Sequence, residues 1–170
     1  MKKFSLSLLA VAGLTATASA LTPEIQLSYG GYTQMDATDM HGGFGKVNNA
    51  WGALTAGVYL PVAPKIDAGV SYTFSSSSFK DTNSSLYYHV VMVNGRYQYY
   101  SNSIVKLYAK VGLGVDITHF AADGISNKSY FAYQVTPVGA KVDLSRGFGI
   151  FGELGFGAQG LLQVGVTYKF

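Results

Sequence analysis

Apolar and polar residues alternate along the last part of the chain. Apolar or aromatic side chains fall at every second position from Leu162 to Phe170, and Gln163, Thr167 and Lys169 lie between them. A repeat of two residues is the periodicity of a β-strand with one apolar and one polar face. The pattern therefore predicts a strand that continues to the last residue.

The same alternation recurs along the rest of the chain. It predicts eight strands, at about residues 24–32, 51–62, 66–74, 86–100, 105–116, 129–144, 148–156 and 161–170. In the sixth segment the apolar face changes phase at Pro137. Because proline cannot donate to a strand ladder, we expect a β-bulge there.

The connections between these strands alternate in length. Short turns are predicted near Pro64, Asn102 and Arg146, and longer loops at residues 33–50, 75–85 and 117–128, with a tight hairpin near 158–160. Short turns at one end and long loops at the other are typical of an up-and-down membrane barrel with an even number of strands. We expect segment 161–170 to pair antiparallel with segment 24–32, which closes the barrel and leaves no free edge.

The first residues have the pattern of a secretory signal peptide. A basic start at Lys2 and Lys3 precedes a short apolar run, and Ala18-Ser19-Ala20 matches a small-residue cleavage site. The apolar run is shorter than the roughly 20 residues that a membrane-spanning helix needs. We therefore predict a cleaved signal peptide at residues 1–20 and one barrel domain at residues 21–170.

Composition narrows the fold class further. Hydrophobic residues make up 48% of the chain and charged residues only 12%, about half the usual share of charge. A closed all-β barrel in a membrane distributes its apolar residues over alternate positions of many strands, which explains this composition without a long apolar run. The net charge of +3 falls to +1 without Lys2 and Lys3, so nothing indicates a nucleic-acid partner. The absence of cysteine excludes disulfides and a lipidated cysteine.

The terminal Phe170, with Tyr168 two residues earlier, resembles the C-terminal assembly signal of Gram-negative outer-membrane barrels. Together with the eight alternating segments, it makes residues 21–170 similar to the small outer-membrane barrels of the OmpX and OmpA transmembrane-domain type. This resemblance implies an outer-membrane location, contact with outer-membrane lipid and lipopolysaccharide, and recognition of the last strand by the barrel-assembly machinery. It also implies a monomer without cofactor or enzymatic activity, with a structural or surface-interaction role through its external loops. The alternative is a soluble lipocalin-like barrel, whose apolar face would point inward.

Titratable residues concentrate on the predicted inward faces of the strands. They are Asp67, Arg96, Lys106, Lys110, Asp116, Lys141, Asp143 and Glu153. Eight strands leave an interior only wide enough for side chains, so we interpret this set as an ion network that fills the lumen. We expect Glu153 to pair with Arg96 or Lys110. The alternative function is a narrow porin-like channel for ions or small solutes, controlled by that pair.

Other candidate chemistry carries less weight. His41, His89 and His119 fall at predicted external positions, where some outer-membrane lipid-modifying enzymes place a catalytic histidine, but no His-x-Ser pair occurs. Residues 35–41 contain two carboxylates and a histidine that could hold a cation, although their spacing matches no ligand motif. Residues 155–160 read G-x-G-x-x-G, but a β-hairpin offers no helix N-terminus for a phosphate. We assign no catalytic, cofactor or metal residues.

Aromatic side chains at outward strand ends predict two membrane-interface girdles. The predicted girdle near the short turns consists of Tyr97, Tyr99, Phe148, Tyr168 and Phe170, and the one near the loops of Tyr29, Tyr72, Phe74, Tyr87 and Phe156.

Overall fold

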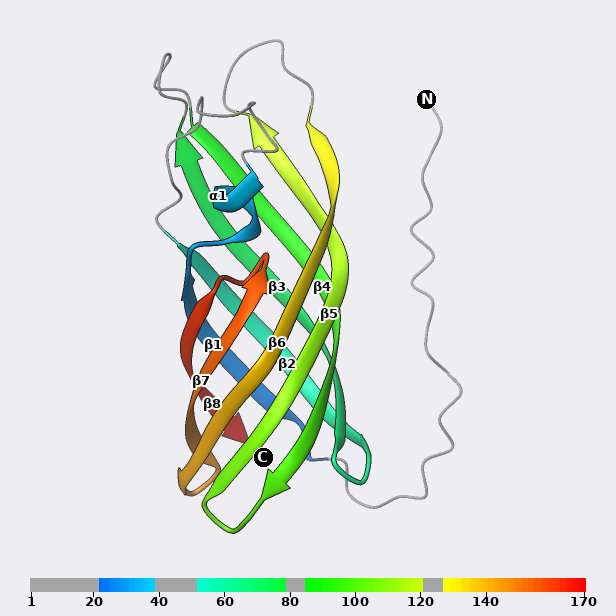
Figure 1. Cartoon of the computed structure of the whole chain (residues 1–170), viewed down its shortest axis with the longest axis vertical. Coiled ribbons are helices and arrows are strands. Elements are labelled where there is room, and N and C mark those ends of the chain that lie inside the picture. Colours follow the sequence, from blue (N-terminus) through cyan, green and yellow to red (C-terminus); the bar gives the residue numbers. More distant parts are fainter. Residues whose placement is uncertain (1–21, 39–51, 79–84, 121–126) are drawn as a thin grey trace.

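The strands close into one antiparallel barrel, with each strand paired to its neighbours in the chain and β8 paired to β1 (Figure 1). The computed structural model describes residues 22–38, 52–78, 85–120 and 127–170. The predicted signal peptide lies outside them. The elements are β1 (Glu24–Gly31), α1 (Gln34–Thr38), β2 (Ala53–Ala63), β3 (Ile66–Ser78), β4 (Ser85–Ser101), β5 (Val105–Phe120), β6 (Lys128–Ser145), β7 (Phe148–Gly157) and β8 (Leu162–Lys169). The predicted all-β, eight-stranded up-and-down architecture is confirmed.

The closing pair of strands has the predicted antiparallel direction. Ile25 of β1 lies opposite Tyr168 of β8, and Tyr29 lies opposite Val164. Phe170 follows the last residue of β8 and donates its backbone N–H to the carbonyl of Pro23 at 3.2 Å. Hydrogen bonding of the last residue to the chain just before β1 ties the C-terminus to the barrel.

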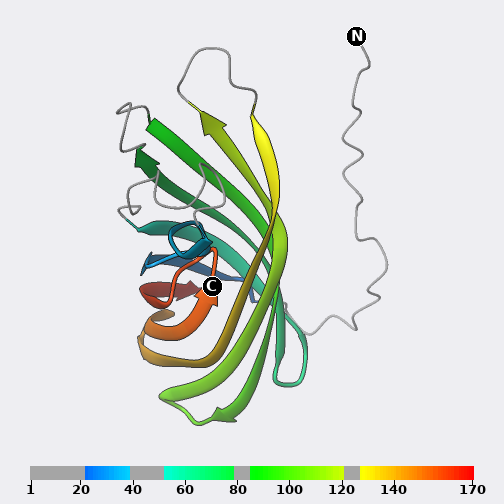
Figure 2. The ribbon, with the colours of Figure 1, turned by 45° about the horizontal axis from the view of Figure 1, so that its top comes forward.

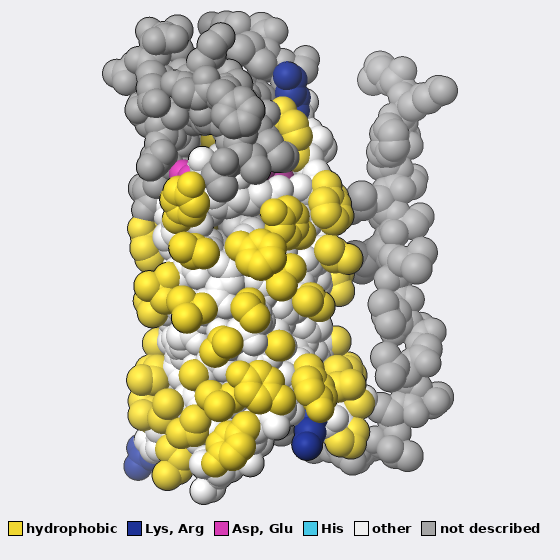
Figure 3. Space-filling model, in the orientation of Figure 1, with side chains coloured by type: hydrophobic (Ala, Val, Ile, Leu, Met, Phe, Trp, Pro, Cys, Tyr) yellow, Lys and Arg dark blue, Asp and Glu magenta, His cyan; other side chains and the backbone are white. Residues whose placement is uncertain are grey.

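Most of the large apolar side chains point away from the barrel interior. Val93 is 66% exposed, whereas the adjacent Asn94 is 2% exposed. The pattern repeats along every strand, and Figure 3 shows hydrophobic side chains spread over the visible exterior between the two ends. This arrangement is the reverse of a soluble lipocalin-like barrel, so that alternative is excluded. None of the helices within the described ranges has the length and apolar character required to cross a bilayer.

The two ends of the barrel differ. We call "turn end" the end with the three tight hairpins β2–β3, β4–β5 and β6–β7, where β1 starts and β8 finishes, and "loop end" the opposite one. Asn102 organises the β4–β5 turn, since its Oδ1 accepts hydrogen bonds from the backbone N–H groups of Ile104 (2.9 Å) and Val105 (2.6 Å). In the β6–β7 turn, Gly147 has a φ of 85°, a conformation that glycine adopts without strain.

The predicted bulge in β6 is confirmed at Pro137. The pairing of β6 with β7 shifts register between Val135 and Val138, so one extra residue is accommodated on β6. The shift restores an apolar exterior on both sides of the proline, which explains the phase change of the sequence pattern.

The barrel wall is uneven in height. β4, β5 and β6 continue well beyond the ends of β1, β7 and β8, and α1 lies beside the β7–β8 hairpin within the mouth (Figures 1 and 2). Two predicted loops were therefore too long: Ser75–Ser78 belongs to β3, and Ile117–Phe120, including His119, belongs to β5. A run of serines has no apolar alternation, so sequence periodicity could not detect this part of β3. The helix α1 was not predicted either.

The predicted girdle residues all point outward, although Tyr72 lies in the middle of β3 and not near its end. Most are well exposed, but Tyr168 is only partly exposed because its ring packs between Phe148 and Phe170, with centroid distances of 4.8 and 5.0 Å. Phe74 is partly covered in the same way by Tyr87, at 6.3 Å.

Candidate functional site in the lumen

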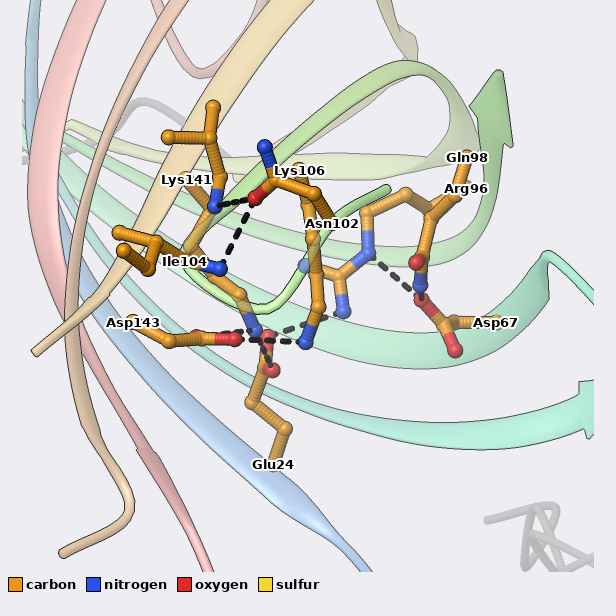
Figure 4. Close-up of polar contacts among 10 residues, drawn as sticks. Glu24, Asp67, Arg96, Gln98, Asn102, Ile104, Lys106, Lys141 and Asp143 are labelled. Atoms are coloured by element: carbon orange, nitrogen blue, oxygen red, sulfur yellow. Dashed lines mark hydrogen bonds and ion pairs between the residues drawn. The ribbon is translucent and has the colours of Figure 1, made fainter. Parts of the chain in front are cut away.

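A network of charged side chains fills the lumen near the turn end (Figure 4). Its centre is Arg96 of β4, whose Nη2 lies 2.9 Å from Glu24 Oε1 and whose Nε lies 2.9 Å from Asp67 Oδ2. Glu24 also forms an ion pair with Lys141 of β6. Since β1 is not a neighbour of β4 or β6 in the sheet, Glu24 ties opposite walls together across the lumen.

The strand register explains why these groups meet. Asp67 lies directly opposite Arg96 on neighbouring strands, so one face of the β3–β4 pair presents both charges. The guanidinium is also flanked by the rings of Tyr59 and Tyr108, at 4.6 and 5.1 Å from its carbon. Cation–π contacts of this kind stabilise a cation that is removed from water. Arg96 is therefore held on several sides.

The network reaches water at its lower edge. Lys106 Nζ lies 2.6 Å from Asp143 Oδ2, and Lys141 Nζ lies 3.4 Å from Asp143 Oδ1. The Asp143 side chain is 35% exposed, whereas that of Arg96 is 4% exposed. Gln98 completes this layer by donating to Asp67 Oδ2 at 2.7 Å. Side-chain exposure in this network thus decreases from Asp143, at the turn end, to Arg96, in the interior.

A second ion pair lies deeper in the lumen. Lys110 of β5 pairs with Glu153 of β7, and both side chains are almost completely buried. Glu153 accepts a hydrogen bond from the hydroxyl of Tyr108 at 2.7 Å, and Lys110 donates to Gln159 Oε1 at 2.8 Å. Of the two partners expected for Glu153, the structure selects Lys110, because Arg96 is already bound to Glu24 and Asp67.

The β7–β8 hairpin contributes an unpredicted part of this site. Gln159, at its tip, is 1% exposed and donates from Nε2 to Ser71 Oγ at 3.0 Å. Its backbone N–H donates to Gln134 Oε1 at 2.9 Å. The hairpin tip is thus bonded to β3 and β6 inside the barrel. Gly157 and Gly160, with φ values of 137° and 105°, permit the turn that directs it inward.

Above this level the lumen becomes apolar. Met35 of α1 packs into a buried cluster whose other members are Leu86, Tyr88, Val90, Met92, Ala132 and Ala158. The four members from β4 alternate along its inner face. An apolar lining is unusual inside a small membrane barrel, whose interior is normally polar.

Two side chains fix α1 at the loop end. Thr33 donates from both its N–H (2.7 Å) and its hydroxyl (2.9 Å) to Asp36 Oδ2, which ties down the first turn in the manner of a capping box. Gln34 donates from Nε2 to the Phe131 carbonyl at 3.2 Å, and its Oε1 accepts from the Tyr133 N–H at 3.4 Å. Gln34 thus covers part of the β6 edge beyond the end of β7.

One side of the lumen is polar but not fully hydrogen-bonded. Both amide atoms of Gln163, together with Gln26 Oε1 and Ser28 Oγ, have no partner among the described residues. Because leaving a buried polar atom unpaired costs about 1–3 kcal/mol, we expect ordered water on this β1–β8 side.

The structure groups the predicted lumen residues into two sets. Asp67, Arg96, Lys106, Lys141 and Asp143 lie in the turn-end network, and Lys110 with Glu153 forms the deeper pair. Asp116 lies apart, toward the loop end, where it accepts from Thr118 at 3.4 Å. Glu24 was missed, although it precedes the inward residues Gln26 and Ser28 by steps of two and could have been assigned by that parity.

The other candidate sites gain no support from the described residues. Asp39 and His41 lie outside the described residues, and no group of three metal-ligating side chains occurs within the parts of the chain that are described. Residues 155–160 form the end of β7 and the following turn, so the G-x-G-x-x-G reading as a phosphate loop has no support. His89 and His119 lie on the outer surface, next to aromatic rings.

Comparison with known proteins yields similarity of fold alone. No protein-family model matches the chain, and no curated protein matches it. The outer-membrane protein Ail of Yersinia pestis, solved in a phospholipid bilayer nanodisc, aligns with a TM-score of 0.51 at 13% identity, over 88% of this chain and 99% of that one. A crystal structure of Ail, the attachment invasion locus protein, aligns with a TM-score of 0.48 at 14% identity, over 88% and 97% of the two chains. The nanodisc structure shares the eight-stranded barrel fold described above.

Proposed function

We propose that the chain is an integral outer-membrane protein, exported by its N-terminal signal peptide and oriented with the turn end in the periplasm. The apolar exterior of a closed barrel, with aromatic side chains at both ends, supports this location, because such a surface is stable only against lipid. A heat-modifiability gel of outer-membrane fractions tests it. A folded barrel migrates differently before and after boiling, and unchanged migration would contradict the proposal.

We propose a surface-interaction role, carried by the part of the sheet that rises above the rest of the barrel. The last pairing of β6 with β7 at this end joins Gln134 to Gly157, and Lys128 to Tyr133 continue beyond it. At about 3.3 Å per residue, this extension is about 20 Å long. Gln34 bonds this extension at Phe131 and Tyr133, the part nearest β7, and we infer that the edge further toward Lys128 is available to a partner. Such an edge accepts an additional strand from an extended polypeptide.

One residue allows a clean test of the edge. Because the Phe131 carbonyl and the Tyr133 N–H both point to the free side, the alternation of a strand directs the N–H of Ser129 to the same side. Ser129→Pro removes that donor without breaking the ladder to β5, and Ser129→Ala is the matched control. Phage-displayed extended peptides, selected on the protein in nanodiscs, should bind the Ala variant and fail to bind the Pro variant. Equal binding, or no selected peptide at all, argues against the edge.

The lumen is proposed to be closed rather than conducting. Ion pairs, tyrosine rings and Gln159 occupy it at successive levels, which supports a structural role without enzymatic activity. The second candidate, a narrow channel, is favoured only by the incompletely bonded β1–β8 side. Planar-bilayer recordings separate the two, since a steady conductance would require an open path past Lys110 and Glu153.

We also propose that Tyr168 and Phe170 form an assembly signal for the barrel-assembly machinery. Both contribute aromatic contacts at the end of β8, where the barrel closes. Deleting Phe170 should lower the yield of folded barrel in cells much more than it lowers the stability of protein refolded into vesicles. If the two decrease together, Phe170 acts in stability only.

A further inference from the structure

Two histidines lie side by side on the outer surface of the loop end. His89 of β4 faces Ile117 of β5 in the ladder, and His119 lies two residues further along β5, so the histidines occupy a diagonal cross-strand position. Their ring centroids are 5.8 Å apart and their planes are nearly perpendicular. His119 is exposed and His89 is partly exposed on the outer face of the sheet.

We propose that His89 and His119 together bind a divalent transition-metal ion of the Cu²⁺, Ni²⁺ and Zn²⁺ class. Neutral imidazole is a preferred ligand of these metals. Bonds from the metal to imidazole nitrogen are about 2.0–2.1 Å long, which places the centroids of two rings on one ion about 5–6 Å apart. The observed spacing already meets this requirement, and water would complete the coordination.

A hydrogen bond prepares His89 for this role. Its Nδ1 lies 2.7 Å from the hydroxyl oxygen of Tyr72 on β3. When Nδ1 carries the proton and donates it to this oxygen, the lone pair of Nε2 is free for the metal. Metal-binding histidines are usually fixed in this way by an oxygen acceptor behind the ring. Tyr72 is therefore a positioning residue and not a ligand.

Aromatic packing holds both rings in place. The ring of Phe74 lies 5.4 Å from that of His89, and Tyr87 lies directly opposite His119 in the ladder. No carboxylate ion pair to either histidine occurs among the described residues, so an incoming cation displaces no salt bridge. The bound ion would link β4 to β5 near the top of the extended sheet.

The binding test uses untagged protein in nanodiscs, titrated with Cu²⁺, Ni²⁺ or Zn²⁺ alone. We expect one site, with Cu²⁺ the tightest. His89→Gln and His119→Gln should each weaken binding at least 10-fold. Tyr72→Phe should weaken it by about 10-fold or more, as loss of such an oxygen acceptor does elsewhere.

Controls make the outcome decisive. His41→Gln should leave binding unchanged, since the proposal needs only the two strand histidines. The paramagnetic resonance spectrum of the Cu²⁺ form should show coupling to two imidazole nitrogens, and to one in either single variant. The proposal fails if the His89→Gln/His119→Gln protein binds as the unchanged protein does, or if the spectrum shows a single imidazole. A matching heat-modifiability shift confirms that each variant folds.

Discussion

The two halves of the lumen are built on different principles. From the turn end up to Lys110 and Glu153, the interior is held by ion pairs between strands that are not neighbours in the sheet. Toward the loop end, the interior contains the apolar cluster that Met35 of α1 closes, beside buried polar side chains such as Asp116, and hydrogen bonds of Thr33 and Gln34 fix α1. In the turn-end half, one charged residue of an ion pair cannot be replaced without its partner. Apolar side chains, in contrast, tolerate replacement by apolar side chains of similar volume.

We therefore expect substitutions in the turn-end half to lower the stability of the barrel, and substitutions in the loop-end half to be tolerated. Removing one member of a buried ion pair leaves an uncompensated charge, so the effect is large and spreads across the barrel. Removing one contact of α1 should affect the neighbouring edge of β6 alone. If this is correct, the protein can change its loop end without weakening the ion-paired half of the barrel.

The largest effect is expected for Glu153→Gln. Lys110 has no other carboxylate within reach among the described residues, so the substitution leaves a buried ammonium with neutral partners alone. The free energy of unfolding, measured by urea denaturation in lipid vesicles, should fall by about 3–5 kcal/mol.

The companion variant for this pair removes both charges. Lys110→Met combined with Glu153→Gln should recover most of the loss, because a neutral pair leaves no buried charge uncompensated. If Glu153→Gln changes neither stability nor single-channel conductance, the pair has neither a structural nor a gating role.

A smaller loss is expected for Glu24→Gln. Arg96 retains Asp67, and Lys141 retains the more distant Asp143, so each cation keeps one carboxylate. We expect the same urea measurement to give a loss of about 2–3 kcal/mol. Asp143→Asn, at the hydrated mouth, is the control and should cost less than about 1 kcal/mol. A larger loss for Asp143→Asn than for Glu24→Gln would contradict the division into a buried interior and an exposed turn end.

The next prediction tests how tightly the ion-paired half is filled. A Cβ at Gly139 would collide with the ring of Tyr108, which cannot move freely because it bonds Glu153 and flanks Arg96. Gly139→Ala should therefore cost about 2 kcal/mol. Gly95→Ala is the matched control: a Cβ there meets nothing within 4 Å, and the melting temperature should not decrease. Equal effects would mean that the lumen has room to adjust.

Much of the barrel was predictable from the sequence because strand alternation is a local signal. It identified the outward faces, the direction of the closing pair and the bulge at Pro137. The reach of Glu24 across the lumen was not predictable, since it depends on which strands face each other after closure. Similarly, Gln159 enters the lumen only because Gly157 and Gly160 adopt positive φ, and a hydropathy pattern does not record backbone dihedrals.

The smallest effect is expected at the loop end, where Gln34 covers the edge of β6. Gln34→Ala removes the acceptor of the Tyr133 N–H, so hydrogen exchange of this amide should accelerate about 5-fold, which corresponds to a loss of about 1 kcal/mol. Gln34→Glu is the control, since it keeps an acceptor for Tyr133 and loses only the donor to Phe131. The global free energy of unfolding should stay unchanged in both variants, because no ion pair is touched. If Gln34→Ala instead destabilises the whole barrel as much as Glu24→Gln does, the two halves unfold as one cooperative unit and cannot vary independently.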